Sequence, residues 1–143
     1  MRPTLPYTFT TIDVSGATHN VALGINGCGQ IVGWYLDANG EGHGYLLDKG
    51  QFTTIDAPGA SFTQPNRINL LGQIVGEQMS SEGIRGFLFD SGHFTTIEIP
   101  ESLLTIAAGI NTRGQIVGLF NTFDDPRQRG FLATPIPQRR QPR

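Results

Sequence analysis

The stretch Ile25-Asn26-Gly27-Cys28-Gly29-Gln30-Ile31-Val32-Gly33 decides the fold class, because the chain contains it three times in variant form. Its other copies are Ile68–Gly76 and Ile110–Gly118, at offsets of 43 and 42 residues. Two further blocks keep the same order and nearly the same spacing, which indicates a tandem repeat. They are Phe-Thr-Thr-Ile-acid, at Phe9–Asp13, Phe52–Asp56 and Phe94–Glu98, and Gly-aromatic-Leu, at Gly44–Leu46, Gly86–Leu88 and Gly130–Leu132.

Each unit divides into four short strands. The Asn-x-x-Gly turn predicts a hairpin, since the Asn side chain can bond the turn backbone and the Gly accepts a positive φ. The sequence therefore predicts an all-β protein of three four-stranded antiparallel units. The expected strands are Val21–Asn26, Arg67–Asn69 and Ala107–Asn111, then Gln30–Tyr35, Gln73–Gln78 and Gln115–Phe120, then His43–Leu47, Arg85–Phe89 and Arg129–Ala133, and last Phe52–Asp56 and Phe94–Glu98.

The repeats predict a single domain over residues 7–134. Its units run over approximately 14–56, 57–98 and 99–134, with an N-terminal strand at 7–13 that belongs to none of them. In ring-shaped repeat proteins such a strand completes the final unit and covers its edge. Residues 135–143, rich in proline and arginine, are expected to form a disordered basic tail.

Three four-stranded meanders suit a β-propeller-like fold. Because propellers have four to eight blades, three blades per chain would be closed by dimerisation. The alternative is a β-prism, which closes three sheets within one chain. A β-trefoil is disfavoured, because its units alternate barrel and cap strands.

The composition limits the partners. A net charge of −2 and a pI near 5.8 provide no basic field, so we expect neither nucleic acid nor membrane as a partner. A single cysteine, Cys28, excludes an intrachain disulfide and a cysteine-only metal site. We expect no cofactor and no metal. The chain contains no signal peptide pattern and no apolar run long enough to span a membrane.

One combination of blocks resembles the HAF family of probable extracellular repeats. It consists of Gly24–Tyr35, then His43–Leu46, then Phe52–Ala60, and the resemblance extends over about residues 7–134. It implies a bacterial propeller-like protein, extracellular or periplasmic, usually with more repeats than three. The histidine of the family name is present only as His43, with Arg85 and Arg129 at the matching positions. The resemblance implies no catalytic residues.

Candidate binding residues lie where the units differ, because residues shared by all three are explained by the fold. The loops before the first strands and between the second and third strands differ in every unit and are expected to share one face. Aromatic rings beside carboxylates and amides there are typical of a sugar-binding site. The predicted ligand-binding residues are Trp34, Tyr35, Asp37, His43, Glu77, Arg85, Phe120, Asn121 and Arg129.

The sequence favours a non-catalytic module that binds carbohydrate or another polar extracellular ligand, built as a homodimer. No Gly-x-Ser-x-Gly motif, metal-ligand spacing or nucleotide fingerprint is present. One alternative is a propeller-type lyase or hydrolase, for which His43, Glu77 and His19 are the candidate acid and base groups. The other is a structural ring for protein interaction, with variable loops and no pockets.

Overall fold

The computed structural model describes residues 6–137, so most of the predicted tail, 138–143, lies outside the described residues. Within that range the chain forms eleven strands and no helix, which confirms the all-β prediction. Accordingly, no helix in this range could span a membrane. The strands are β1 (His19–Ile25), β2 (Ile31–Leu36), β3 (Gly42–Asp48), β4 (Gln51–Ile55), β5 (Phe62–Ile68), β6 (Ile74–Ser80), β7 (Gly83–Asp90), β8 (His93–Ile97), β9 (Ser102–Ile110), β10 (Ile116–Thr122) and β11 (Arg129–Ala133).

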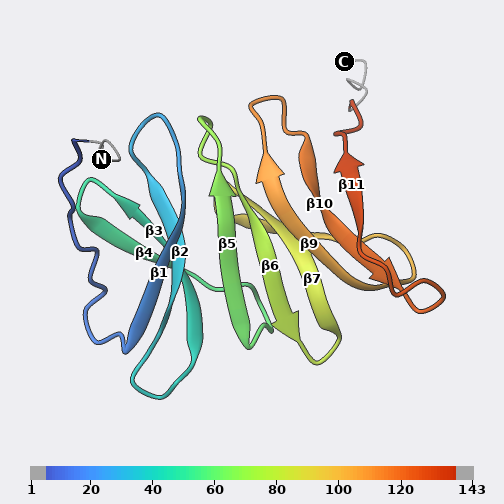
Figure 1. Ribbon diagram of the computed structural model, residues 1–143, viewed down its shortest axis with the longest axis horizontal. Helices are drawn as coiled ribbons and strands as arrows, with labels where there is room; N and C mark the ends of the chain where they lie inside the picture. The colour runs from blue at the N-terminus through green and yellow to red at the C-terminus, as the bar shows by residue number, and fades with distance from the viewer. Residues whose placement is uncertain (1–5, 138–143) are drawn as a thin grey trace, which may run out of the picture.

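The strands form three antiparallel meanders in chain order (Figure 1). Unit 1 is β1–β4, unit 2 is β5–β8 and unit 3 is β9–β11. One parallel pair, Ile84 with Leu104, joins β7 to β9, so that units 2 and 3 together count as one seven-stranded mixed sheet. The antiparallel units are as predicted, and the parallel contact between two of them is not.

The first strands of units 2 and 3 are longer than predicted. The sequence predicted the first strand of unit 2 at Arg67–Asn69, yet β5 begins at Phe62 and contains Pro65. Pro65 is fully buried and stands where the register shifts by one residue. Since β5 pairs with only one neighbour, β6, a proline without an N–H is tolerated there.

The strand predicted at Phe9–Asp13 is absent. Residues 6–14 have no regular secondary structure, and the side chain of Phe9 is 94% exposed. In Figure 1 this segment lies at one end of the row of units and β11 at the other, so the two are too far apart to pair within one chain. The backbone N–H and C=O groups of a strand need hydrogen-bond partners on a neighbouring strand, and this segment has no such neighbour among residues 6–137.

The units pack face to face in a row. Strand β5 packs against β1, β2 and β3, and β9 packs in the same way against β5, β6 and β7. We call the face of a unit that meets the next unit its back face, and the opposite face its front face. Val32 and Ile55 on the back of unit 1 meet Ile74 and Phe87 on the front of unit 2, and all four side chains are buried.

The second core repeats this arrangement. Val75 on the back of unit 2 meets Ala107 and Ile116 of unit 3, with Phe131 packed alongside. Among the described residues, no strand of unit 3 packs extensively on a strand of unit 1. The row is therefore open, with an uncovered front face on unit 1 and an uncovered back face on unit 3.

The last glycine of the repeated block allows close packing of neighbouring strands. A Cβ added to Gly33, Gly76 or Gly118 would collide with a backbone carbonyl of the neighbouring first strand. The aromatic ring of the third strand occupies the space beside this glycine, and in unit 1 the Tyr45 hydroxyl donates a 3.1 Å hydrogen bond to the Val21 carbonyl. The glycine thus lets first and second strands lie close beneath an aromatic side chain.

Candidate functional site

The row of units has two different ends along the strand direction. The Asn-x-x-Gly turns β1–β2, β5–β6 and β9–β10 lie together at the upper end in Figure 1, which we call the turn face. The loops β2–β3, β6–β7 and β10–β11 lie together at the lower end, the loop face. The segments that enter β5 and β9 also reach the loop face, so the variable loops share one end, as predicted.

The turn face is a repeated hydrogen-bond network. Within the second turn, the Asn69 side-chain oxygen accepts hydrogen bonds from the backbone N–H groups of Leu71 and Gln73. Its amide nitrogen donates to the Gln73 side chain. Its amide also donates a 2.9 Å bond to the Asn111 carbonyl of unit 3, just as Asn26 donates to the Asn69 carbonyl at 3.0 Å. The shared asparagines therefore cap their own turns and link consecutive units, which is a structural role.

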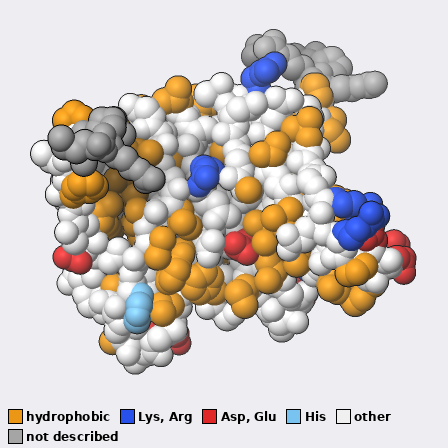
Figure 2. All heavy atoms as spheres, in the orientation of Figure 1, with side chains coloured by type: hydrophobic (Ala, Val, Ile, Leu, Met, Phe, Trp, Pro, Cys, Tyr) orange, Lys and Arg blue, Asp and Glu red, His pale blue; other side chains and the backbone are white. Residues whose placement is uncertain are grey.

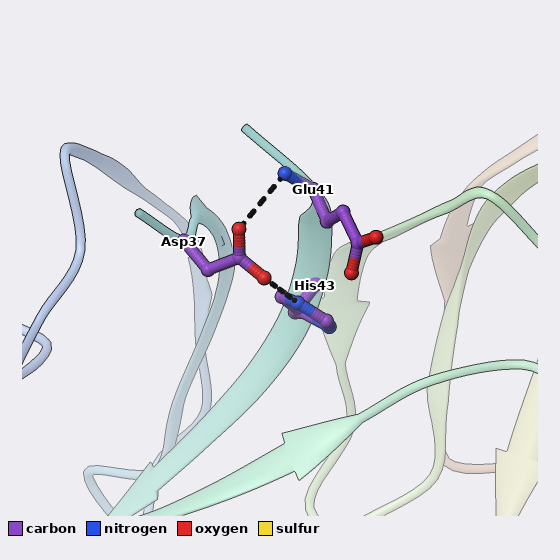
Figure 3. A group of neighbouring side chains, drawn as sticks. All are labelled: Asp37, Glu41 and His43. Atoms are coloured by element: carbon purple, nitrogen blue, oxygen red, sulfur yellow. Dashed lines mark hydrogen bonds and ion pairs between the residues drawn. The ribbon is translucent and has the colours of Figure 1, made fainter. Parts of the chain in front are cut away.

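On the loop face of unit 1, His43 lies between two carboxylates. Its Nε2 is 2.9 Å from Asp37 Oδ2, and its Nδ1 is 2.9 Å from both oxygens of Asp56. Figure 3 shows the Asp37 carboxylate directed both at the His43 ring and at the backbone of Glu41. The second oxygen of Asp37 accepts the N–H groups of Asn39 and Glu41, so it also fixes the β2–β3 loop.

This arrangement favours a charged His43. The hydrogen bond to Asp37, and then those to Asp56, raise the pKa of His43 above its ordinary value, while partial burial opposes them. The pKa of Asp37 is lowered, chiefly by the same hydrogen bond to His43. A ring with a carboxylate at each nitrogen can donate to both only as the imidazolium.

Asp37 and His43, together with Glu41, include the donor types of a metal site. Ligand atoms of Asp37, Glu41 and His43 lie within 4.8 Å of one another, and Asp56 stands behind the His43 Nδ1 as an orienting carboxylate would. Every one of these contacts is equally accounted for by the protonated ring. The cluster therefore serves as an ion-paired support for the loop.

The matching positions in units 2 and 3 carry arginine. In unit 2, Arg85 Nε lies 2.9 Å from Glu98 Oε1, which repeats the pairing of His43 with Asp56. In unit 3, Arg129 lies over the Phe120 ring, 4.7 Å from its centroid, and 3.8 Å from Asp125 Oδ2. Since residues 6–137 give unit 3 no fourth strand, Arg129 has no partner that corresponds to Asp56 or Glu98.

A pocket opens on the loop face at each junction between units. The first junction pocket, of about 280 Å³, lies between units 1 and 2. The second junction pocket, of about 580 Å³, lies between units 2 and 3 and is the larger. Both have a cation and its paired acid in the wall. The first is lined by Glu41, Gly42, His43, Asp56, Ala60 and Ser61, and the second by Arg85, Glu98, Pro100, Glu101, Ser102, Thr122, Phe123 and Asp124.

The β10–β11 loop beside the second pocket is the most charged part of the loop face. In Figure 2 one group of blue and red side chains lies together at the right, where that loop lies in Figure 1, while the other charged side chains in this view are scattered. Arg127 bonds Asp125 at 2.9 and 3.0 Å and lowers the pKa of that carboxyl. Next to them the Phe123 ring is 82% exposed at the pocket rim.

The structure places several predicted ligand residues away from these pockets. Trp34 packs edge-on against Phe62, with ring centroids 5.4 Å apart, so it lies between units 1 and 2 rather than open on the loop face. Glu77 is half-buried, accepts a 3.1 Å bond from Gln64, and has a pKa raised by burial. Neither residue lines a junction pocket.

Two of the other predicted residues line the pockets, and the rest contact the paired cations or lie next to them in the chain. Tyr35 packs beside His43, with ring centroids 5.1 Å apart, and its hydroxyl is 3.1 Å from the Thr54 hydroxyl. Phe120 supports Arg129, and the half-buried Asn121 has a side-chain oxygen without a hydrogen-bond partner among the described residues. His43 and Arg85 line the first and second pockets, and Asp37 adjoins the first through His43.

The three candidate catalytic groups do not form one cluster. His43 is paired with carboxylates of unit 1, Glu77 bonds within unit 2, and His19 contacts the Thr18 hydroxyl at 3.3 Å. No hydrogen bond or ion pair within residues 6–137 connects any two of them.

Sequence reasoning did not single out Phe123, Glu101 and Ser102. One signal pointed to Phe123, because the β10–β11 loop is longer than its counterparts, and function is expected where one repeat departs from the others. Glu101 has a φ of 64°, a left-handed value for a non-glycine residue, which the sequence alone does not disclose. In comparisons with known proteins, no family model and no curated protein matches the chain.

Proposed function

We propose that this protein is a non-catalytic binding module whose ligand, a carbohydrate or another polar molecule, occupies the junction pockets of the loop face. The observation that carries the proposal is the second junction pocket, where an exposed ring, Phe123, stands beside Arg85 and Asp124. At about 580 Å³ the pocket is in the size range of small-molecule sites. Sugars need this combination of an apolar surface for stacking and polar groups at its edge.

The charge of the second pocket narrows the ligand class. Three carboxylates, of Glu98, Glu101 and Asp124, line it against one guanidinium, that of Arg85, which is already paired with Glu98. A negative potential repels anionic ligands and attracts neutral or cationic ones. Neutral sugars and amino sugars are therefore better ligands for this pocket than uronic acids.

The repetition of the pocket supports binding over catalysis. Two junction pockets of the same construction stand side by side on one face, so a ligand with several sugar residues can engage both and gain affinity by multivalency. The enzyme alternative has less support. His43 has a carboxylate against each ring nitrogen, which raises its pKa and leaves neither nitrogen free to take a proton from a substrate, so it is a poor general base.

A propeller-like ring is the architecture that best supports this function. Each unit is an antiparallel meander that packs its back face on the front face of the next, as propeller blades do. A prism would close unit 3 on unit 1 within one chain, and the described strands of these units do not pack together. The resemblance to HAF repeats supports an extracellular or periplasmic location. A propeller-like ring needs more than three blades, which supports a homodimer.

The proposal is tested by titrating the ¹⁵N-labelled protein with three probes of equal length, namely a cello-oligosaccharide, a chitosan oligosaccharide and an oligogalacturonate. The expected result is binding of the neutral or the amino probe, with chemical-shift changes at Phe123 and Glu101, and weaker binding of the acidic probe. Replacement Phe123→Ala should lower the affinity about two- to tenfold, since stacked rings contribute roughly 0.5–1.5 kcal/mol.

The matched control is Leu71→Ala. Leu71 is a similarly exposed apolar side chain, at 67%, but it lies on the turn face. Its removal should leave the affinity unchanged. If the two variants lose binding equally, or if no probe binds at millimolar concentration, the proposal is wrong.

A further inference from the structure

The two ends of the row of units are complementary to each other. The front face of unit 1 exposes Phe52 (40%) and Ile25 (67%), and a small apolar pocket there is lined by residues of β1 together with Ile31. The back face of unit 3 exposes Val117 (48%) and Leu132 (62%). In both internal junctions a back face of this kind is covered by the front face of another unit.

The same complementarity extends to strand pairing. In units 1 and 2 the third strand pairs with a fourth strand of sequence Phe-Thr-Thr-Ile, with Gly44 opposite Ile55 and Gly86 opposite Ile97. Among residues 6–137, β11 pairs only with β10, while the matching sequence Phe9–Ile12 pairs with no strand. The free edge of β11 and an unpaired segment with the sequence of a fourth strand thus lie at opposite ends of the molecule (Figure 1).

Two polar positions complete the pattern. His43 pairs with Asp56 and Arg85 with Glu98, so the repeat places an acid after the fourth strand opposite the cation of the third. For Arg129 the residue at that position in the repeat is Asp13. On the turn face, Asn26 and Asn69 each donate to the following unit, and for Asn111 the corresponding acceptor is the Asn26 carbonyl.

We infer that two copies of this chain form one six-bladed ring, in which Phe9–Asp13 of each copy becomes the fourth strand of the other copy's unit 3 and Asp13 pairs with Arg129 across the interface. The inference rests on the proposed ring and deepens it. Each back face of unit 3 then covers a front face of unit 1, and a third junction pocket forms that neither copy has alone. The exchange also pairs the free edge of β11 in each copy.

The register gives a sharp test by cross-linking. By analogy with Leu46 opposite Thr53 and Leu88 opposite Thr95, Leu132 should stand opposite Thr10 of the other copy. In a Cys28→Ser background, Thr10→Cys combined with Leu132→Cys should form a disulfide-linked dimer in high yield under mild oxidation. The matched control, Thr10→Cys combined with Arg113→Cys on the turn face, should remain uncross-linked.

A second test uses the buried position of the transferred strand. Ile12 corresponds to Ile55, which is 2% exposed, whereas Thr10 corresponds to the exposed Thr53. Ile12→Asp should weaken the dimer by about 100-fold or more, because a charge would be buried in the interface. Thr10→Asp, two residues away, should leave it intact. Circular dichroism of Ile12→Asp should retain the all-β spectrum, because Ile12 lies outside both cores.

The mass by light scattering decides the inference. Twice the 15.5 kDa of the chain is expected for wild type and Thr10→Asp, and the single-chain mass for Ile12→Asp. A monomeric wild type at 100 µM, a larger assembly, or equal cross-linking of both cysteine pairs would overturn it. Binding at the second junction pocket is contained within one chain, so Phe123-dependent sugar binding by a monomer would refute the dimer while sustaining the proposed function.

Discussion

The turn face and the loop face are built from the same three repeats, yet they differ in what repetition preserves. On the turn face every unit keeps its Asn, Gly and Gln; each Asn side chain bonds its own turn, and those of units 1 and 2 also bond the next unit. On the loop face the units keep only a pattern, a cation opposite an acid, and vary the residues around it. The comparison teaches that residues identical in all repeats hold the units together, whereas variation on a shared pattern marks the face to which we assign the proposed ligand.

The largest expected effect comes from the closest packing next to the turn face. Gly76→Ala would drive a Cβ into the Gln64 carbonyl, with the Phe87 ring 2.9 Å away on the other side. Neither a backbone group nor a fully buried ring can move aside, so we expect a loss of about 3 kcal/mol in the free energy of unfolding or failure to fold. Chemical denaturation measures it. Gly59→Ala, at an open position with nothing within 4 Å of its Cβ, is the control and should cost only the strain of its positive φ.

The next largest effect tests whether the asparagines shared by the repeats hold consecutive units together. Asn69→Ala removes the amide that bonds Gln73 and Asn111 and the oxygen that caps two N–H groups, at a position only 5% exposed. The unpaired buried groups should lower the free energy of unfolding by about 2–3 kcal/mol. With both variants made in the monomeric Ile12→Asp background, Asn111→Ala should cost less, because there its amide bonds only within its own turn. Equal losses would contradict the role of Asn69 as a link between units.

A smaller loss of stability is expected at Trp34, which the sequence predicted to be a ligand-binding residue. Because Trp34 packs on Phe62 between units, Trp34→Ala should lower the free energy of unfolding by about 2 kcal/mol and leave sugar affinity within about twofold once the protein is folded. Thermal unfolding combined with the oligosaccharide titration separates the two readouts. A selective loss of binding at unchanged stability would return Trp34 to the ligand site.

The smallest effect is a pH dependence confined to unit 1. The pKa of His43 is raised by Asp37 and Asp56, so its stabilisation is fully present below the unfolded value of 6.5 and is lost as the pH rises through the folded pKa. The pKa of Asp37 is lowered in the folded state. Its contribution to stability is therefore present above the unfolded value of 3.8 and is lost as the pH falls through the folded pKa. His43→Gln should flatten the decline of the unfolding temperature above pH 6.5. A decline of the same steepness in the variant would assign it to another group.

Much of the fold could be predicted because its signals are local. The turns at Asn26, Asn69 and Asn111 and most strand ends follow from residues within one repeat. The failures are non-local. Pro65 enters a strand because β5 is an edge strand with a bulge, and Phe9–Asp13 is not a strand because no edge in the same chain reaches it.

The candidate site was predictable only in part, for the same reason. The loop face and the residues His43 and Arg85 follow from alignment of the repeats, and the structure places both in pocket walls. The pockets themselves form between units, so no single repeat discloses that Phe123 and Glu101 come together. Trp34 was placed on the binding face because of its residue type, but its place on the back face of unit 1 depends on which side of β2 meets Phe62.

The most direct test of the contrast between the two faces is the residue-by-residue map of the oligosaccharide titration on the ¹⁵N-labelled protein. We expect shift changes at the rim of the second junction pocket, at Glu101, Phe123 and Asp124, with smaller ones around His43, and none at Asn26, Asn69 and Asn111. Changes centred on the turn face, or no change with the neutral, amino and acidic probes alike, would contradict the assignment of binding to the loop face.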